Sequence, residues 1–595
     1  MKGPSTGSVS APEHVGPDFG DGRVRRRALV LARKHAAAFA VLSLFACGDD
    51  VEATDAGSDD VVFVDVAADP SIADVIVADV QDAHVGANDA AEDVTVADAE
   101  VPAWRSALYP ADWTPEFTAP GGAFLHDFSY AGAFNGERSL PEPGGPRFDV
   151  LEFGADAEGS ADSGPAFQAA IDAASAEGGV VWVPAGTYQV DETLRVEASN
   201  VIIRGEGPTS QVYFTQSEGM TGRAHLLFAG RGSEGAQTPL IMDGPARQTY
   251  VEVESTADLR IGDQVAIGFV ITPAFIERHG MTGTWVSFTD QYKHFYRRTI
   301  VRIDKDTSRV HLDVPLRDDV LASDGAELRV LSGLLEGVGL ESIAFSNALT
   351  QDAASSVDRT HAVRMEWVVD SWVRSLTSFA SPRGANDEHL LSGGLKILNS
   401  HRVTVRESEL QLAQNRGGGG NGYLFEVSKS NEVLFVDDIG RRGRHNFIQN
   451  WDFGTSGIVW LRCQSLDGVA INSGFELVGL SEFHHSLATA NLIDGNVSTD
   501  GWSAVNRGNY SSGAGLSAKE NVFWNHRGGR LRSYQYGLGY VIGTVDVNVQ
   551  TELGGAFLGE DIGTAPEDYV EGRDMGASLT PVSLYEDQLR RRLER

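Results

Sequence analysis

Residues 147–214 read RFDVLEFGADAEGSADSGPAFQAAIDAASAEGGVVWVPAGTYQVDETLRVEASNVIIRGEGPTSQVYF, and the fold class can be inferred from this segment. Within it, four apolar residues recur at the spacing of one helix face: Phe167, Ala170, Ile171 and Ala174. Ser163 is expected to cap this helix, Pro165 suits its first turn, and Gly178-Gly179 ends it. Short β-rich runs follow at 180–183, 187–190, 193–196 and 201–203, with Pro and Gly at the corners. The stretch therefore predicts one helix followed by short strands with tight corners.

The same residues resemble the opening of the pectate-lyase superfamily, in its rhamnogalacturonase/epimerase-like and pectate lyase 3 types. The matching motifs are Phe153-Gly154-Ala155 with Gly159 and Asp162, Gly179 to Tyr188, and Ile202 with Gly205 and Gly207. This resemblance implies an all-β fold, a right-handed parallel β-helix whose N-terminal end is closed by the helix. It does not specify the chemistry, because that fold carries lyases, hydrolases and non-catalytic adhesins.

The rest of the chain shows two further strand patterns. Strands over residues 225–332 alternate apolar and polar residues between Gly/Asp turns, which predicts a small antiparallel β insertion. From residue 333, Val373, Val403, Val433 and Ile458 recur at intervals of 30, 30 and 25 residues. That interval is the scale of one β-helix coil with its loops. Apolar residues at 585, 589 and 593 predict a short C-terminal helix.

The N-terminal segment resembles a bacterial lipoprotein signal. A basic run at 23–34 precedes an apolar run at 36–46 that is too short to span a membrane, and Cys47 follows directly. The resemblance implies lipidation of Cys47, export, and anchoring to the outer membrane or cell surface. The alternative is an ordinary signal peptide with a coincidental cysteine. Residues 48–100 contain sixteen Asp/Glu and no Lys or Arg, a composition typical of a flexible tether.

Composition excludes some classes of function. The chain has 595 residues and a formal charge of −35, which argues against binding to nucleic acid or to an anionic membrane face. Its only other cysteine, Cys463, is expected to be a buried apolar residue.

Aromatic residues in 101–146 either pack on the β-helix or stack on sugars, and packing is favoured. The expected segments are the signal 1–47, tether 48–100, aromatic strap 101–146, cap and first coils 147–224, insertion 225–332, main coils 333–560 and tail 561–595.

Acids, bases and aromatic residues concentrate between residues 416 and 532. A uronate lyase must compensate the substrate carboxylate, remove the proton at C5 and protonate the leaving oxygen. Arginine suits the carboxylate and histidine suits the base. The candidate catalytic residues are His445, Arg444, His484, Glu482 and Asp438. The candidate substrate-binding residues are Arg441, Arg507, Trp502, Tyr510 and Arg530, with Tyr510 also a possible acid.

Two other functions remain open. A glycoside hydrolase needs two carboxyl groups flanking the bond, and Asp437, Asp438, Asp452, Glu476 and Glu482 are available. A non-catalytic carbohydrate-binding or adhesion lipoprotein could use the same scaffold. No cofactor is predicted. Neighbouring residues of one strand point to opposite faces, so His484 and His485 are not expected to share a metal. Calcium at Asp437/Asp438 is an alternative.

The sequence therefore predicts a surface-anchored, polysaccharide-degrading enzyme. A β-eliminative lyase on a uronate-containing glycan is favoured over a hydrolase, because Arg and His outnumber an obvious carboxylate pair. Its partner is a polysaccharide, and its membrane contact is through the lipid anchor alone.

Overall fold

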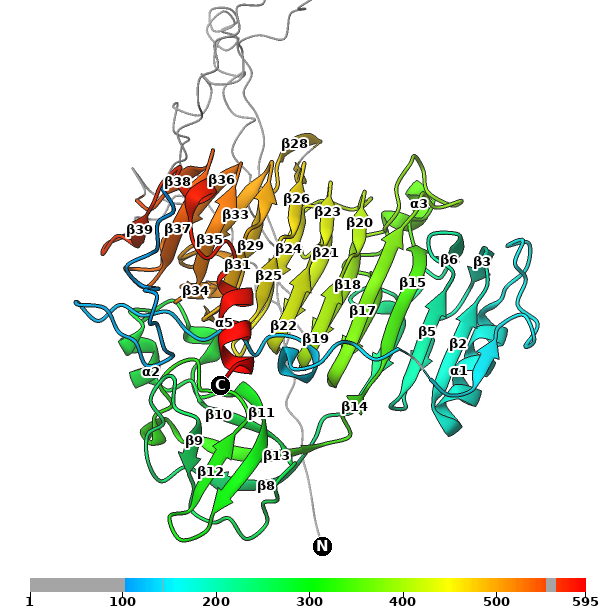
Figure 1. The fold of residues 1–595 in the computed structure, drawn as a ribbon. Coiled ribbons are helices and arrows are strands. Elements are labelled where there is room, and N and C mark those ends of the chain that lie inside the picture. The colour runs from blue at the N-terminus through cyan, green and yellow to red at the C-terminus, as the bar shows by residue number, and fades with distance from the viewer. Residues whose placement is uncertain (1–101, 143, 473, 553–562) are drawn as a thin grey trace, which may run out of the picture.

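The computed structural model describes residues 102–142, 144–472, 474–552 and 563–595. Three long ladders of parallel strands form the body of the molecule, and the chain visits each ladder once per coil (Figure 1). This architecture is a parallel β-helix, so the predicted fold class is confirmed. Cys47, the signal and the tether lie outside the described residues.

The first ladder contains β1 (Arg147–Asp149), β2 (Gly179–Val183), β5 (Val201–Gly205), β15 (Gly339–Ser346), β17 (Val368–Ser378), β19 (His401–Arg406), β22 (Asn431–Val436), β25 (Val459–Leu461), β31 (Leu492–Asp494), β35 (Val522–Arg527), β37 (Tyr540–Val545) and β39 (Tyr569–Glu571). The second contains β4 (Leu194–Val196), β7 (Ala224–Ala229), β16 (His361–Glu366), β18 (Gly393–Leu398), β21 (Tyr423–Ser428), β24 (His445–Gln449), β29 (Ser481–Phe483), β33 (Gly501–Ala504), β36 (Arg530–Ser533) and β38 (Asn548–Gln550). The third includes β3 (Gly186–Val190), β6 (Ser210–Phe214), β20 (Glu409–Gln411), β23 (Ile439–Arg441), β26 (Gln464–Leu466) and β32 (Val497–Ser498). Smaller elements are β14 (Leu335–Glu336), β30 (Ala488–Thr489), β34 (Ala518–Lys519), α3 (Gln351–Ala354) and α4 (Tyr510–Gly513).

Stacked apolar side chains fill the interior of the coils. In the second ladder, Phe425 pairs in register with Leu395 and Phe447, and all three are buried in one continuous core. Cys463 is buried in the same core, as predicted. Burial of such side chains, at about 1.5–3 kcal/mol each, is the main force that holds successive coils together.

Helix α1 (Gly164–Glu177) closes the N-terminal end of this core (Figure 1). Its buried face consists of the predicted residues Phe167, Ala170, Ile171 and Ala174, and it ends at Gly178. Ser163 is the N-cap residue, as predicted, but its side chain makes no capping hydrogen bond to the helix. Its Oγ instead accepts a hydrogen bond from the Asp156 amide at 2.9 Å, which ties the helix to the preceding turn.

An antiparallel insertion projects from the β-helix as a separate lobe (Figure 1). It comprises β8 (Ser233–Pro239), β9 (Tyr250–Glu252), β10 (Gln264–Val270), β11 (Tyr292–Asp304), β12 (Arg309–Leu312) and β13 (Glu327–Ser332), with α2 (Pro273–Arg278). Strand β7, which the sequence pattern placed in this insertion, pairs in parallel with β16 instead. A buried ion pair of 2.6 Å between Arg317 and Glu432 fastens the lobe to the coils.

The aromatic strap and the C-terminal helix cover the outer face of the first ladder. Tyr109, Trp113 and Phe128 are buried there, in one cluster with Leu584 and Tyr585 of α5 (Leu584–Leu593). The described aromatic residues of this cluster therefore pack against the coils. Among the described helices, none is long and apolar enough to cross a membrane.

The coil repeat was predicted with one register error. Val403 pairs with Val433, as expected, but Val373 pairs with Val405 rather than Val403. Both positions are apolar and buried, so the amino-acid pattern alone does not distinguish them.

Candidate active site

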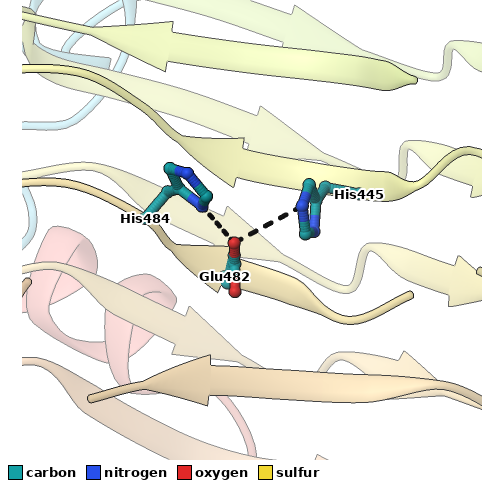
Figure 2. Close-up of side chains that lie close together, drawn as sticks. All are labelled: His445, Glu482 and His484. Atoms are coloured by element: carbon teal, nitrogen blue, oxygen red, sulfur yellow. Dashed lines mark hydrogen bonds and ion pairs between the residues drawn. The ribbon is translucent and has the colours of Figure 1, made fainter. Parts of the chain in front are cut away.

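The second ladder carries a compact polar cluster outside the apolar core. His445 begins β24, Glu482 lies in the middle of β29, and His484 follows that strand. Phe483 points into the core, so its neighbour Glu482 projects to the opposite side of the sheet. Figure 2 shows the three side chains directed toward one another. We call these three residues and Arg507, which follows β33, the Glu482 cluster.

The geometry places three basic side chains around one carboxylate. The Nδ1 atom of His484 is hydrogen bonded to Glu482 Oε1, and His445 Nε2 lies 3.4 Å from the same oxygen. Arg507 Nη1 donates to Glu482 Oε2 at 3.2 Å. The four residues are between 3% and 7% exposed, so their interactions are protected from solvent.

Burial and charge determine the protonation states. Burial alone would raise the pKa of Glu482, but its contacts with His445, Arg507 and His484 outweigh burial and hold that pKa well below its usual range. Burial lowers the pKa of His445 to about 3, and the opposing effect of Glu482 does not overcome it. Glu482 is therefore ionised and His445 is neutral at physiological pH.

The hydrogen bonds of His445 determine its tautomer. Its Nδ1 lies 2.5 Å from the carbonyl oxygen of Leu480, which can only accept, so Nδ1 carries the proton. Its Nε2 is then an unprotonated acceptor. That atom is buried, and no hydrogen-bond donor reaches it from the described part of the chain. This nitrogen has the protonation state of a general base.

The cluster also resembles a metal-ligand set. One ligand atom each from His445, Glu482 and His484 lie within 4.8 Å of one another, a combination that suits a transition metal. His445 comes from the adjacent coil. The sequence pattern of His484 and His485 concerns one strand only, so it could not predict His445 as a further ligand. The local charge disfavours a divalent cation, because Glu482, the one carboxylate of the Glu482 cluster, is already paired with Arg507. The calcium alternative fails, because Asp437 pairs with Arg462 at 2.8 Å and Asp438 accepts two backbone amides.

Three of the predicted site residues lie elsewhere. Asp438 is fully buried at a corner, where burial raises its pKa well above the usual range and the Ser408 and Val436 amides donate to it, so it is structural. Arg441 lies on the third ladder and pairs with Asp467 at 3.0 Å. Trp502 is buried in the core, stacked on Phe447, because β33 places it inward. These corrections follow from the side of the sheet each residue occupies.

The remaining predicted residues lie on segments next to the Glu482 cluster or further along the second ladder. Arg444 precedes His445, is buried, and donates to the carbonyl of Gly417 at 3.0 Å. Tyr510 starts α4, and its amide donates to the carbonyl of Arg507 at 3.1 Å. Arg530 is exposed on β36, two strands from β29.

Sequence reasoning missed two features beside the cluster. The ring of Tyr423 lies 5.2 Å from that of His445 and 6.3 Å from that of His484. A second buried carboxylate, Glu426, pairs with Lys396 and His361, each at 2.8 Å. Burial would raise the pKa of Glu426, but Lys396 and His361 hold it far below its usual range. The 30-residue spacing of 396 and 426 matches one coil and is the signal that could have revealed this pair.

Substitution of Trp502 by alanine tests its corrected position. We expect Trp502→Ala to lower the free energy of unfolding by about 3–5 kcal/mol, because it leaves a cavity among stacked rings. Urea unfolding of the two proteins measures the difference. Unchanged stability together with weaker polysaccharide binding would show that Trp502 faces the ligand after all.

Fold and site together define a parallel β-helix protein with a buried His–Glu–His–Arg cluster on one outer face. Residues 147–252 match the family described as rhamnogalacturonase A/epimerase, pectate lyase-like, which confirms the resemblance noted in the sequence. Mannuronan C5-epimerase AlgE1 of Azotobacter vinelandii is 25% identical over 231 residues, covering 37% of this chain and 15% of that protein. AlgE3 of the same organism is 25% identical over 210 residues, or 34% and 10% of the two chains. The matched regions thus span only a small part of these relatives.

Solved structures with a similar trace have low sequence identity. The tailspike of Pseudomonas phage phi297 has a TM-score of 0.39 at 12% identity, covering 72% of this chain and 73% of that one. The A-module of mannuronan C-5 epimerase AlgE6 of Azotobacter vinelandii has a TM-score of 0.29 at 13% identity, covering 72% and 98%.

Proposed function

We propose that this protein is a polysaccharide-acting enzyme that removes the C5 proton of a uronate residue, and that it acts as a β-eliminative lyase. The observation that carries the proposal is the unprotonated Nε2 of His445 beside the Arg507–Glu482 ion pair. A uronate lyase needs this combination of a base and a cation for the substrate carboxylate. The names of the two mannuronan C5-epimerases support a polysaccharide as the ligand.

Each group has a defined part in the reaction. Arg507 binds the substrate carboxylate through Nε, which has no partner among the described residues, while Nη1 stays on Glu482. His445 Nε2 accepts the C5 proton, and the electrons of the C5–H bond form the C4–C5 double bond. The C4–O4 bond breaks, and the leaving oxygen takes a proton from Tyr510. Glu482 holds Arg507 and His484 in position.

Both reactive nitrogen atoms are buried, so a sugar reaches them only after a neighbouring segment moves. Arrival of the substrate carboxylate also adds negative charge beside His445. Negative charge favours the protonated imidazole, so substrate binding raises the pKa of His445 and strengthens it as a base.

Hydrolysis is disfavoured by the same electrostatics. Glu426 and Glu482 lie in one row of the sheet, two strands apart, or about 9–10 Å at the backbone. That spacing approaches what an inverting glycosidase uses, but such an enzyme needs one carboxyl group protonated. Their basic neighbours hold the pKa of both groups below the usual range, so neither can supply a proton at neutral pH.

C5 epimerisation is the second candidate function. It begins with the same proton removal but returns a proton to the opposite face of the ring and breaks no glycosidic bond. The names of the two Azotobacter relatives favour it.

A screen on acidic and neutral polysaccharides tests the proposal. Eliminative cleavage gives new reducing ends together with absorbance at about 235 nm from the new double bond. Reducing ends without absorbance would move the assignment to a hydrolase. Neither signal, with unchanged C5 stereochemistry, would favour a non-catalytic binding protein. Lipid anchoring at Cys47 at the cell surface remains a prediction.

The pH dependence of kcat/KM provides a further prediction. A base whose pKa is about 3 in the free enzyme is unprotonated at all higher pH values. We therefore expect no loss of kcat/KM on acidification through the ordinary histidine range, between about pH 8 and pH 5. An acid limb centred near the ordinary histidine pKa would show that His445 titrates normally.

A further inference from the structure

Two arginines converge on one carboxylate at the edge of the Glu482 cluster. The hairpin formed by β27 (Val469–Asn472) and β28 (Phe475–Val478) precedes β29 and carries Glu476. Glu476 Oε1 lies 3.9 Å from Nη2 of Arg416 and 3.9 Å from Nη2 of Arg442. Both distances exceed a hydrogen bond, so a single carboxylate stands between two guanidinium groups without satisfying either one.

Arg416 is the less satisfied of the two. Its side chain is only 14% exposed, and its Nε and Nη1 atoms are buried with no hydrogen-bond partner in the described ranges. Burial, and then the charge of Arg442, lower its pKa. Buried guanidinium nitrogens without hydrogen-bond partners are costly, and a planar anion that accepts from one of them together with Nη2 would offset part of that cost.

This pair of arginines borders the candidate catalytic residues. A Cβ atom on Gly422 would lie 3.2 Å from Cα of Arg416 and 2.7 Å from Cβ of Arg444, so these three residues are in contact. Tyr423 and His445 follow Gly422 and Arg444 directly in the chain. The backbone of Arg416 therefore lies beside the segment that carries His445, so an extended ligand at the Glu482 cluster passes close to Arg416.

We propose that Arg416 and Arg442 form a second carboxylate-binding subsite, which takes a neighbouring uronate residue of the bound polysaccharide. Glu476 occupies the subsite when no ligand is present, and the incoming carboxylate displaces it. The choice of a uronate as ligand rests on the proposed function. Glu476 is 60% exposed and makes only long contacts with the two arginines. A substrate carboxylate in its place can form bidentate hydrogen bonds with them.

The subsite predicts opposite effects from neighbouring substitutions. Arg416→Gln and Arg442→Gln each remove one charge-assisted contact and are expected to weaken binding about 10- to 100-fold. Glu476→Gln removes the resident competitor and is expected to tighten binding several-fold. Arg441→Gln is the matched control, because Arg441 adjoins Arg442 but pairs with Asp467.

The first measurement needs no sugar. Inorganic sulfate is titrated into the full-length Glu476→Gln protein by calorimetry and compared with the Arg416→Gln/Glu476→Gln double variant. Sulfate binding to the single variant alone supports an anion site at these arginines. Equal binding, or none in either protein, overturns the site whatever the activity of the enzyme.

The second measurement identifies the ligand. Tetragalacturonate and tetramannuronate, each with its methyl-esterified neutral form, are titrated into His445→Ala proteins so that the ligand is not consumed. Tighter binding of a charged oligomer, weakened by Arg416→Gln and unchanged by Arg441→Gln, supports the uronate subsite. Sulfate binding without any dependence of oligomer binding on Arg416 overturns the uronate assignment. The polysaccharide screen decides the proposed function separately.

Discussion

His445→Ala is expected to lower kcat on a susceptible polyuronate by about 10²- to 10⁴-fold, the usual contribution of a general base. The carbonyl of Leu480 holds the imidazole proton on Nδ1 of His445. The Nε2 atom, which lies 3.4 Å from Glu482, is therefore unprotonated and can accept the C5 proton. Initial rates from the absorbance of the unsaturated product measure the effect.

A matched substitution separates this effect from general damage. His311 lies on strand β12 of the insertion, away from the cluster, so His311→Ala should retain full activity. Activity of His445→Ala within a few-fold of the unmodified protein would show that another group removes the proton.

Glu482→Gln is expected to abolish activity and to destabilise the fold by about 3–5 kcal/mol, because it leaves Arg507 buried without its counter-charge. Urea unfolding and initial rates measure the two effects. The pKa of the Glu482 carboxyl is lower in the folded than in the unfolded protein. Its ionisation therefore contributes to the free energy of unfolding above about pH 4.3, the pKa in the unfolded chain. That contribution is lost as the pH falls toward the pKa of the folded protein. The stability difference between the two proteins should therefore shrink in acid.

Glu432→Gln is the control for this prediction. Glu432 is equally buried and lies between Arg317 and Arg298, at 2.6 and 3.3 Å, where the insertion joins the coils. We expect it to lose comparable stability but to keep the activity of the folded protein. Parallel losses of activity in both variants would show that Glu482 acts only through stability.

Most of the fold could be predicted because its signals are local. The apolar spacing in α1 and the short runs of β2, β3 and β5 each specify their own element. The register between coils is not local, which is why Val373 was aligned two residues away from its partner. Loops of different length separate the strands, and the sequence does not show which residues then lie side by side.

The site could be predicted only in part for the same reason. His445, Glu482, His484 and Arg507 stand out as polar residues within apolar coils, and the structure brings them together. Trp502 was misplaced because a one-residue change in register moves a side chain from the outer face to the core. The pairing of Arg416 with Glu476 depends on how a hairpin folds back, which no spacing in the sequence reveals.

Proton NMR of a polyuronate incubated with the enzyme in D₂O shows whether the enzyme removes the C5 proton, because it observes that proton itself. We expect loss of the C5 proton signal, with either a vinyl proton from elimination or deuterium at C5 from epimerisation. With the His445→Ala protein, the C5 proton signal should stay unchanged. New reducing ends formed while the C5 proton remains intact would contradict the proposed proton removal, since the bond would then have been cleaved by hydrolysis.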